Sequence, residues 1–152
     1  MTEILQGIRI LEVAEHTFVP AASAVLADFG AEVIKIEHVS RGDAMRGLAA
    51  TGVADLPTDV HPLLEHSNRG KKSIGLDLTS PEGLDVLHKF IATSDVFLTN
   101  KLPGVRSKLN IEVEQVRAHN PSIIYVRGTG QGATMSGVRS DRRTLEQRAK
   151  WR

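Results

Sequence analysis

Basic residues stand beside glycines or polar residues at several places in the chain. Arg41, Gly42 and Arg46 lie in one such segment, Arg69-Gly70-Lys71-Lys72 forms another, and Gly128-x-Gly130-x-Gly132 forms a third. Backbone amides exposed at glycines and cationic side chains can together replace the hydration of a phosphate group. These segments therefore favour a phosphorylated ligand over an uncharged one.

Each segment also has a structural interpretation. The 128–132 segment lacks the G-x-G-x-x-G spacing of a dinucleotide-binding turn, and the exit from a strand needs glycine in any case. The basic residues of the 69–72 segment are typical of solvated cations that protect an edge strand. Asp43, directly after Gly42, is typical of a turn. The residues alone therefore predict a cationic rim and leave its ligand open.

Composition narrows the possible classes of protein. The 152 residues include 19 Lys and Arg, 18 Asp and Glu, and no cysteine, which excludes disulfides, thiolate zinc sites and cysteine nucleophiles. No pair of histidines has the spacing of a helical metal motif, so we expect no metal at His16, His38, His61 or His66. No apolar run approaches the roughly 18 residues of a membrane span, and the start does not resemble a secretory signal. We expect a cytoplasmic protein without a membrane partner.

Residues 133–152 differ in charge from the rest of the chain. Their basic residues are Arg139, Arg142, Arg143, Arg148, Lys150 and Arg152, against Asp141 and Glu146. A basic segment can bind nucleic acid, but this one has no interleaved aromatic residues and no long block of one charge. We therefore expect no nucleic-acid partner.

The elements that must position the basic segments follow an alternating order. Strands are predicted at 8–13, 32–37, 73–78, 95–98 and 123–126, and helices at 21–29, after Ser80-Pro81 and at 110–119, with a long loop over 38–70 that includes a short helix near 63–66. This order predicts an α/β fold, a mostly parallel Rossmann-like sheet with helices on both faces. Ligands bind such sheets beyond the carboxyl ends of the strands, where most of the polar segments fall.

A series of stretches, in order along the chain, resembles one known family. The stretches are 5–12, 24–37, Gly42-Asp43 with Arg46, 68–78, 95–104 and 120–125. Together they resemble the amino-terminal portion of the large domain of the family III CoA-transferases, the formyl-CoA, carnitine-CoA and bile-acid-CoA transferase type, which is also related to α-methylacyl-CoA racemase. The resemblance implies transfer of CoA between an acyl-CoA and a free carboxylic acid, with coenzyme A as substrate and no permanently bound cofactor. It also implies an interlocked homodimer and an aspartate nucleophile.

The resemblance also implies which residues contact CoA. By similarity, these are Thr17, Phe18, His38, Leu76, Asp77, Leu78, Thr79, Asn100, Lys101, Leu102 and Lys108. Charge and position within or beside the same loops add the phosphate partners Arg41, Arg46, Lys72 and Arg106. His38 stands where many relatives have Arg, and a neutral His is a weaker phosphate partner than Arg.

The resemblance fades after Gly132, which predicts two parts of the chain. Residues 1–132 are expected to form a CoA-binding α/β domain, an incomplete large domain, and 133–152 a divergent basic tail. The expected nucleophilic Asp lies beyond Arg152, so no catalytic residue is assigned. We expect a truncated or frame-shifted chain, or one fragment of a split enzyme with a complementing second chain.

Two alternatives remain open at this point. One is an α-methylacyl-CoA racemase-like protein, which uses a His and an Asp as acid and base. Its Gly-His-Asp marker is not found after Gly132. The other is a non-catalytic CoA-binding or dimerisation fragment, which predicts CoA binding without acyl exchange.

Overall fold

The computed structural model describes residues 3–51 and 61–130. Its centre is a five-stranded sheet with the order β3-β2-β1-β4-β5, and every ladder between these strands is parallel. The strands are β1 (Arg9–Val13), β2 (Glu32–His38), β3 (Lys72–Leu76), β4 (Val96–Thr99) and β5 (Ile124–Arg127). The helices are α1 (Phe18–Asp28), the 3-10 helix η1 (Ala44–Thr51), α2 (Pro62–Asn68), α3 (Pro81–Ala92), α4 (Pro103–Lys108) and α5 (Val113–His119).

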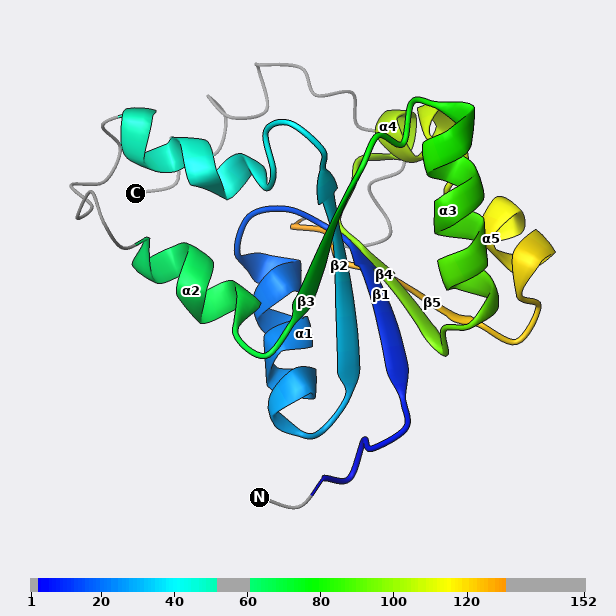
Figure 1. Ribbon diagram of the computed structural model, residues 1–152, viewed down its shortest axis with the longest axis horizontal. Coiled ribbons are helices and arrows are strands. Elements are labelled where there is room, and N and C mark those ends of the chain that lie inside the picture. Colours follow the sequence, from blue (N-terminus) through cyan, green and yellow to red (C-terminus); the bar gives the residue numbers. More distant parts are fainter. Residues whose placement is uncertain (1–2, 52–60, 131–152) are drawn as a thin grey trace, which may run out of the picture.

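The strand order places helices on both faces of the sheet. From β1 the chain adds β2 and then β3 on one side, and it then crosses back to add β4 and β5 on the other side. Because parallel crossovers are right-handed, this reversal moves the connecting helices to the opposite face. Figure 1 shows α1 and α2 on one face and α3 and α5 on the other. The predicted fold class is confirmed.

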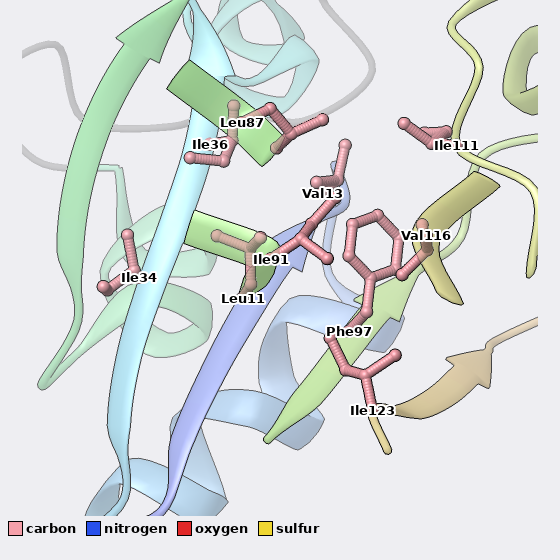
Figure 2. Close-up of a cluster of buried hydrophobic side chains, with 10 residues drawn as sticks. All are labelled: Leu11, Val13, Ile34, Ile36, Leu87, Ile91, Phe97, Ile111, Val116 and Ile123. Carbon is pink, nitrogen blue, oxygen red and sulfur yellow. The ribbon is translucent and has the colours of Figure 1, made fainter. Parts of the chain in front are cut away.

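Alternating side chains of the central strands fill a core on each face. On the α3 and α5 face, the buried cluster in Figure 2 consists of Leu11, Val13, Ile34, Ile36, Leu87, Ile91, Phe97, Ile111, Val116 and Ile123. On the α1 face, Ile10, Val33 and Leu98 pack with Val19 of α1. Burying one such side chain contributes about 1.5–3 kcal/mol, so the two clusters hold the sheet in register.

Most predicted elements lie within a few residues of the observed ones. Ser80 caps α3 as expected, since its Oγ accepts a hydrogen bond of 3.0 Å from the backbone N–H of Gly83. Gly30 follows α1 with a φ of +97°, which favours glycine. However, α1 begins at Phe18 rather than Ala21, because Pro20 is tolerated in the first turn, where helix N–H groups have no intrahelical partner.

The region between β4 and β5 differs from the expectation. A single helix was predicted over 110–119, but the structure has α4 and then α5, which begins at Val113. Asn110, between them, has a φ of +53°, a conformation that ends the first helix. The turn brings Ile111 into the core, where it is fully buried.

Candidate functional site

A cleft of about 250 Å³ opens at the carboxyl ends of β1, β2 and β3, beside α4. Its lining residues are Val13, Glu15, Ile36, Glu37, His38, Arg41, Leu76, Asp77, Leu78, Thr79, Lys101, Val105, Lys108 and Leu109. In Figure 1 this is the end of the sheet opposite the amino terminus. The position agrees with the rule that open parallel sheets bind ligands beyond their carboxyl ends.

The cleft gathers about half of the predicted CoA contacts. Those that line it are His38, Arg41, Leu76, Asp77, Leu78, Thr79, Lys101 and Lys108. The predicted contacts that do not line it are Thr17, Phe18, Arg46, Lys72, Asn100, Leu102 and Arg106. Sequence reasoning missed Val13, Glu15, Ile36, Glu37, Val105 and Leu109, of which the first four lie within two residues of the carboxyl ends of β1 and β2.

The cations of the cleft differ in whether they are already paired. Lys101 forms an ion pair of 2.7 Å between its Nζ and Glu15 Oε1. Arg41 and Lys108 are exposed, and neither forms an ion pair with any residue in the ranges 3–51 and 61–130. These two side chains therefore have their hydrogen-bond donors available for an anionic ligand.

His38 contributes an N–H donor to the cleft. Its Nδ1 lies 3.2 Å from the backbone nitrogen of Ser40, whose N–H donates to it. An N–H group donates only to an unprotonated ring nitrogen, so a ring that accepts this bond at Nδ1 carries its N–H at Nε2. His38 thus offers one N–H donor at the position where the family resemblance places many arginines.

Each carboxylate of the cleft already has an ion-pair or hydrogen-bond partner. Asp77 Oδ1 accepts hydrogen bonds from the hydroxyl and the backbone N–H of Thr79, at 2.6 and 2.9 Å, and these bonds lower the pKa of Asp77. Burial raises the pKa of Glu37, but hydrogen bonds from Ser73, the Asp43 backbone and Arg46 outweigh burial and hold that pKa below its usual value. Asp77 and Glu37 therefore stay ionised and hold the loops of the cleft in place.

Three predicted phosphate partners have other roles in the structure. Lys72 lies at the amino end of β3, where its Nζ is 2.7 Å from Glu32. The cleft lies at the carboxyl end of the same strand, so the length of β3 separates Lys72 from it. Arg46 forms an ion pair of 3.1 Å with Glu37, which leaves it less available than Arg41.

Arg106 is 5% exposed. Its Nε donates to Glu112 at 3.0 Å and its Nη1 to the carbonyl of Lys101 at 2.6 Å. These bonds connect the start of α5 to the loop after β4, so Arg106 holds that loop in place. A basic residue near a predicted loop is therefore not by itself a ligand contact.

The structure contradicts one structural interpretation made from the sequence, that of Lys71, and supports another, that of Gly128. The side chain of Lys71 is 2% exposed and its Nζ lies 2.7 Å from Glu12 Oε2, so the expectation of a solvated cation is wrong for Lys71.

A Cβ at Gly128 would overlap Cγ2 of Val19, so this glycine is required for the close packing of α1 beside β5. The structural interpretation thus accounts for Gly128, while Gly132 lies outside the described residues.

Across the two described ranges, no helix has the length and apolar character needed to span a membrane. Within the same ranges, no group of three or more His, Cys, Asp or Glu side chains could hold a metal ion.

A parallel Rossmann-like sheet, with a cleft beyond the carboxyl ends of its strands, defines the protein as a member of the open α/β class. The sequence model of one family, CoA-transferase family III, matches residues 5–149. The chain therefore belongs to CoA-transferase family III. The match continues past Gly132, where the resemblance was expected to fade; the division of the chain at that residue stays a prediction.

Similar proteins agree with this assignment. The chain is 32% identical over 129 residues to (R)-2-hydroxy-4-methylpentanoate CoA-transferase of Clostridioides difficile, covering 85% of this chain and 32% of the relative. It is 37% identical over 134 residues to formyl-CoA:oxalate CoA-transferase of Rhodopseudomonas palustris, covering 87% and 31%. A crystal structure of a CAIB/BAIF family protein from Brucella suis superposes with a TM-score of 0.74 at 29% identity, covering 88% and 35%. The chain spans about a third of the length of these proteins.

Proposed function

We propose that the cleft binds the coenzyme A portion of an acyl-CoA. The observation that carries this proposal is that Arg41 and Lys108, without ion-pair partners in the described ranges, line one cleft together with the Nε2–H donor His38. Membership of CoA-transferase family III supplies the class of ligand. CoA carries phosphate groups that cationic and N–H donors can bind.

The size and lining of the cleft suit one part of CoA. Sites for drug-sized ligands measure about 300–1,000 Å³, whereas this cleft has about 250 Å³. Its apolar lining includes Ile36, Leu76 and Leu109, which can contact a planar base or an aliphatic chain. We therefore propose that the cleft takes one end of CoA with its phosphates at the cationic rim, while the acyl end extends beyond the cleft.

The reaction proposed for the complete enzyme is the transfer of CoA from an acyl-CoA to a free carboxylic acid. Relatives named for such transfers support it. We assign the nucleophile to no residue of this chain, because Glu15, Glu37 and Asp77 are each held by an ion pair or by hydrogen bonds. We further propose a cytoplasmic protein that works as a homodimer or with a second chain; relatives named as alpha and beta subunits support the latter arrangement.

Calorimetric titration with CoA tests the proposed site. The double variant Arg41→Ala plus Lys108→Ala should bind CoA at least about tenfold more weakly, because a hydrogen bond to a charged group contributes about 1.5–3 kcal/mol when it is desolvated, and less at an exposed rim. The matched control is Lys89→Ala plus Arg117→Ala, which removes two exposed cations from α3 and α5 outside the cleft. Absence of saturable binding, or equal weakening in both variants, would contradict the proposal.

A second measurement separates a transferase from a binding fragment. The chain is incubated with an acyl-CoA and a different free carboxylic acid, and new acyl-CoA is detected by mass spectrometry. Exchange supports the transferase reaction for this chain. Binding of CoA without exchange supports the alternative of a non-catalytic CoA-binding fragment.

A further inference from the structure

Four charged side chains form a buried network beneath the loops that follow β1 and β2. Lys35 Nζ lies 3.1 Å from Glu12 Oε1 and 2.6 Å from Asp43 Oδ2, and Lys71 Nζ lies 2.7 Å from Glu12 Oε2. None of the four side chains is more than 2% exposed. The network is neutral, with two cations and two carboxylates, and Ser23 Oγ donates a further hydrogen bond to Glu12.

The network ends at Asp43, which holds the two loops together. Its Oδ1 accepts hydrogen bonds from the backbone N–H of His16, in the loop after β1, at 2.9 Å and from that of Met45 at 2.8 Å. Its own backbone N–H donates to Glu37 Oε2 at 2.8 Å. His16 has a φ of +67°, an unfavourable conformation for a residue other than glycine, and the bond to Asp43 fixes its amide there.

A buried ion pair generally adds little to the free energy of unfolding, so its presence calls for an explanation other than stability. Removing two charges from water offsets most of their attraction, and apolar residues of similar volume often stabilise a protein at least as well. A network that stabilises the fold no better than apolar residues would, but that fixes two loops, is therefore best explained by the geometry that it imposes. Both loops carry residues of the cleft, Glu15 in the first and Arg41 in the second.

We propose that the buried network of Glu12, Lys35, Asp43 and Lys71 positions the two loops of the cleft, with Asp43 as the positioning residue that connects them. Its carboxylate contacts the first loop through Oδ1 and the strand beneath through Oδ2 and Lys35. None of the four side chains lines the cleft. The network thus acts on the ligand through Glu15, His38 and Arg41. This inference rests on the proposed CoA site for its effect on binding, but not for its effect on the loops.

The test is the double variant Lys35→Met plus Asp43→Asn. It cuts the link between strand and loop and leaves Glu12 paired with Lys71, so no buried charge loses its only partner. Asparagine keeps an oxygen that can accept the bond from His16. We expect a folded protein whose affinity for CoA falls about tenfold or more, and whose amides at His16 and Met45 exchange hydrogen faster than in the unaltered chain.

The matched control is Arg69→Met plus Asp28→Asn. This pair has the same charges and a distance of 2.5 Å, but each side chain is 39% exposed and the pair joins α2 to α1, away from the cleft. It should leave both the affinity for CoA and the exchange at His16 and Met45 unchanged. A network with only a structural role would lower the melting temperature of the Lys35 and Asp43 variant without changing affinity or exchange in the folded protein, and that result overturns the proposal.

Hydrogen exchange distinguishes failure of the proposed CoA site from failure of the positioning role. If the unaltered chain does not bind CoA, the proposed function fails, and hydrogen exchange at His16 and Met45 still decides the positioning role. If the double variant does not fold, exchange in the unaltered chain decides it: protection of the His16 and Met45 amides equal to that of β1 supports the proposal. Exchange at the rate of an exposed loop overturns it.

Discussion

Substitution of Gly128 by alanine tests how α1 packs beside β5. A Cβ at this position would overlap Cγ2 of Val19, which is 2% exposed and has no room to move into solvent. Overpacking of a core costs about 1–3 kcal/mol. Alanine also restricts the unfolded chain relative to glycine, which recovers about 0.4–1 kcal/mol. We therefore expect Gly128→Ala to lower the free energy of unfolding by about 1–2 kcal/mol, and the melting temperature by about 2–8 °C.

Gly130 provides the matched control for this experiment. Among the described residues no atom lies within 4 Å of a Cβ built at Gly130, so Gly130→Ala should be neutral or stabilising by up to about 1 kcal/mol. Denaturant unfolding measures both variants. Shortening Val19 to alanine in the Gly128→Ala background should recover part of the loss, which a double-mutant cycle detects as coupling. Equal stability of the two glycine variants would refute this reasoning, and a loss of CoA affinity specific to Gly128→Ala would favour the phosphate-turn interpretation.

Further predictions concern pH and helix capping. Burial raises the pKa of Asp43, but hydrogen bonds from Lys35, Met45 and His16 outweigh it and lower that pKa. Asp43 therefore contributes stability above its unfolded pKa of about 3.9, which is lost as the pH falls through the lower folded pKa; unfolding followed against pH should show a weaker acid dependence in Asp43→Asn. Burial raises the pKa of Tyr125, the single tyrosine, to about 12, so its ultraviolet titration should occur well above pH 10 in the folded protein and near pH 10 after denaturation. Ser80→Ala should lower the free energy of unfolding by about 1 kcal/mol in denaturant titrations, because α3 loses its side-chain cap.

The sequence supports prediction of the sheet and of the end where the cleft lies. Alternating apolar residues in the 32–37 segment and the cap at Ser80 act over a few positions, so local patterns identify them. The rule for carboxyl ends points to the segment after residue 37, and His38 of that segment lines the cleft; Asp77, which only the family resemblance indicated, lines it as well. These predictions depend on the spacing of residues within one element, which a single sequence shows, and on the handedness of parallel crossovers, which is the same in nearly all proteins.

The surroundings of individual cations could not be predicted in the same way. Lys71 and Lys72 are adjacent, yet Lys71 is buried against Glu12 and Lys72 is exposed beside Glu32. Their partners lie 59 and 40 positions away in the sequence, and only the strand register brings them together. Arg106 is a similar case, because its burial depends on the unexpected turn between α4 and α5. Partner choice across such distances is a property of tertiary structure.

The central place of β1 has a consequence for synthesis of the chain. Its two neighbours differ in when they emerge from the ribosome: β2 follows directly, whereas Thr99 of β4 bonds to the carbonyl of Val13 across 86 positions. A nascent chain that has reached Leu76 can assemble β1, β2 and β3, but the edge of β1 then carries unpaired backbone groups. At about 5–20 residues per second, this open edge lasts for seconds, the time in which a chaperone can bind it or another nascent chain can pair with it.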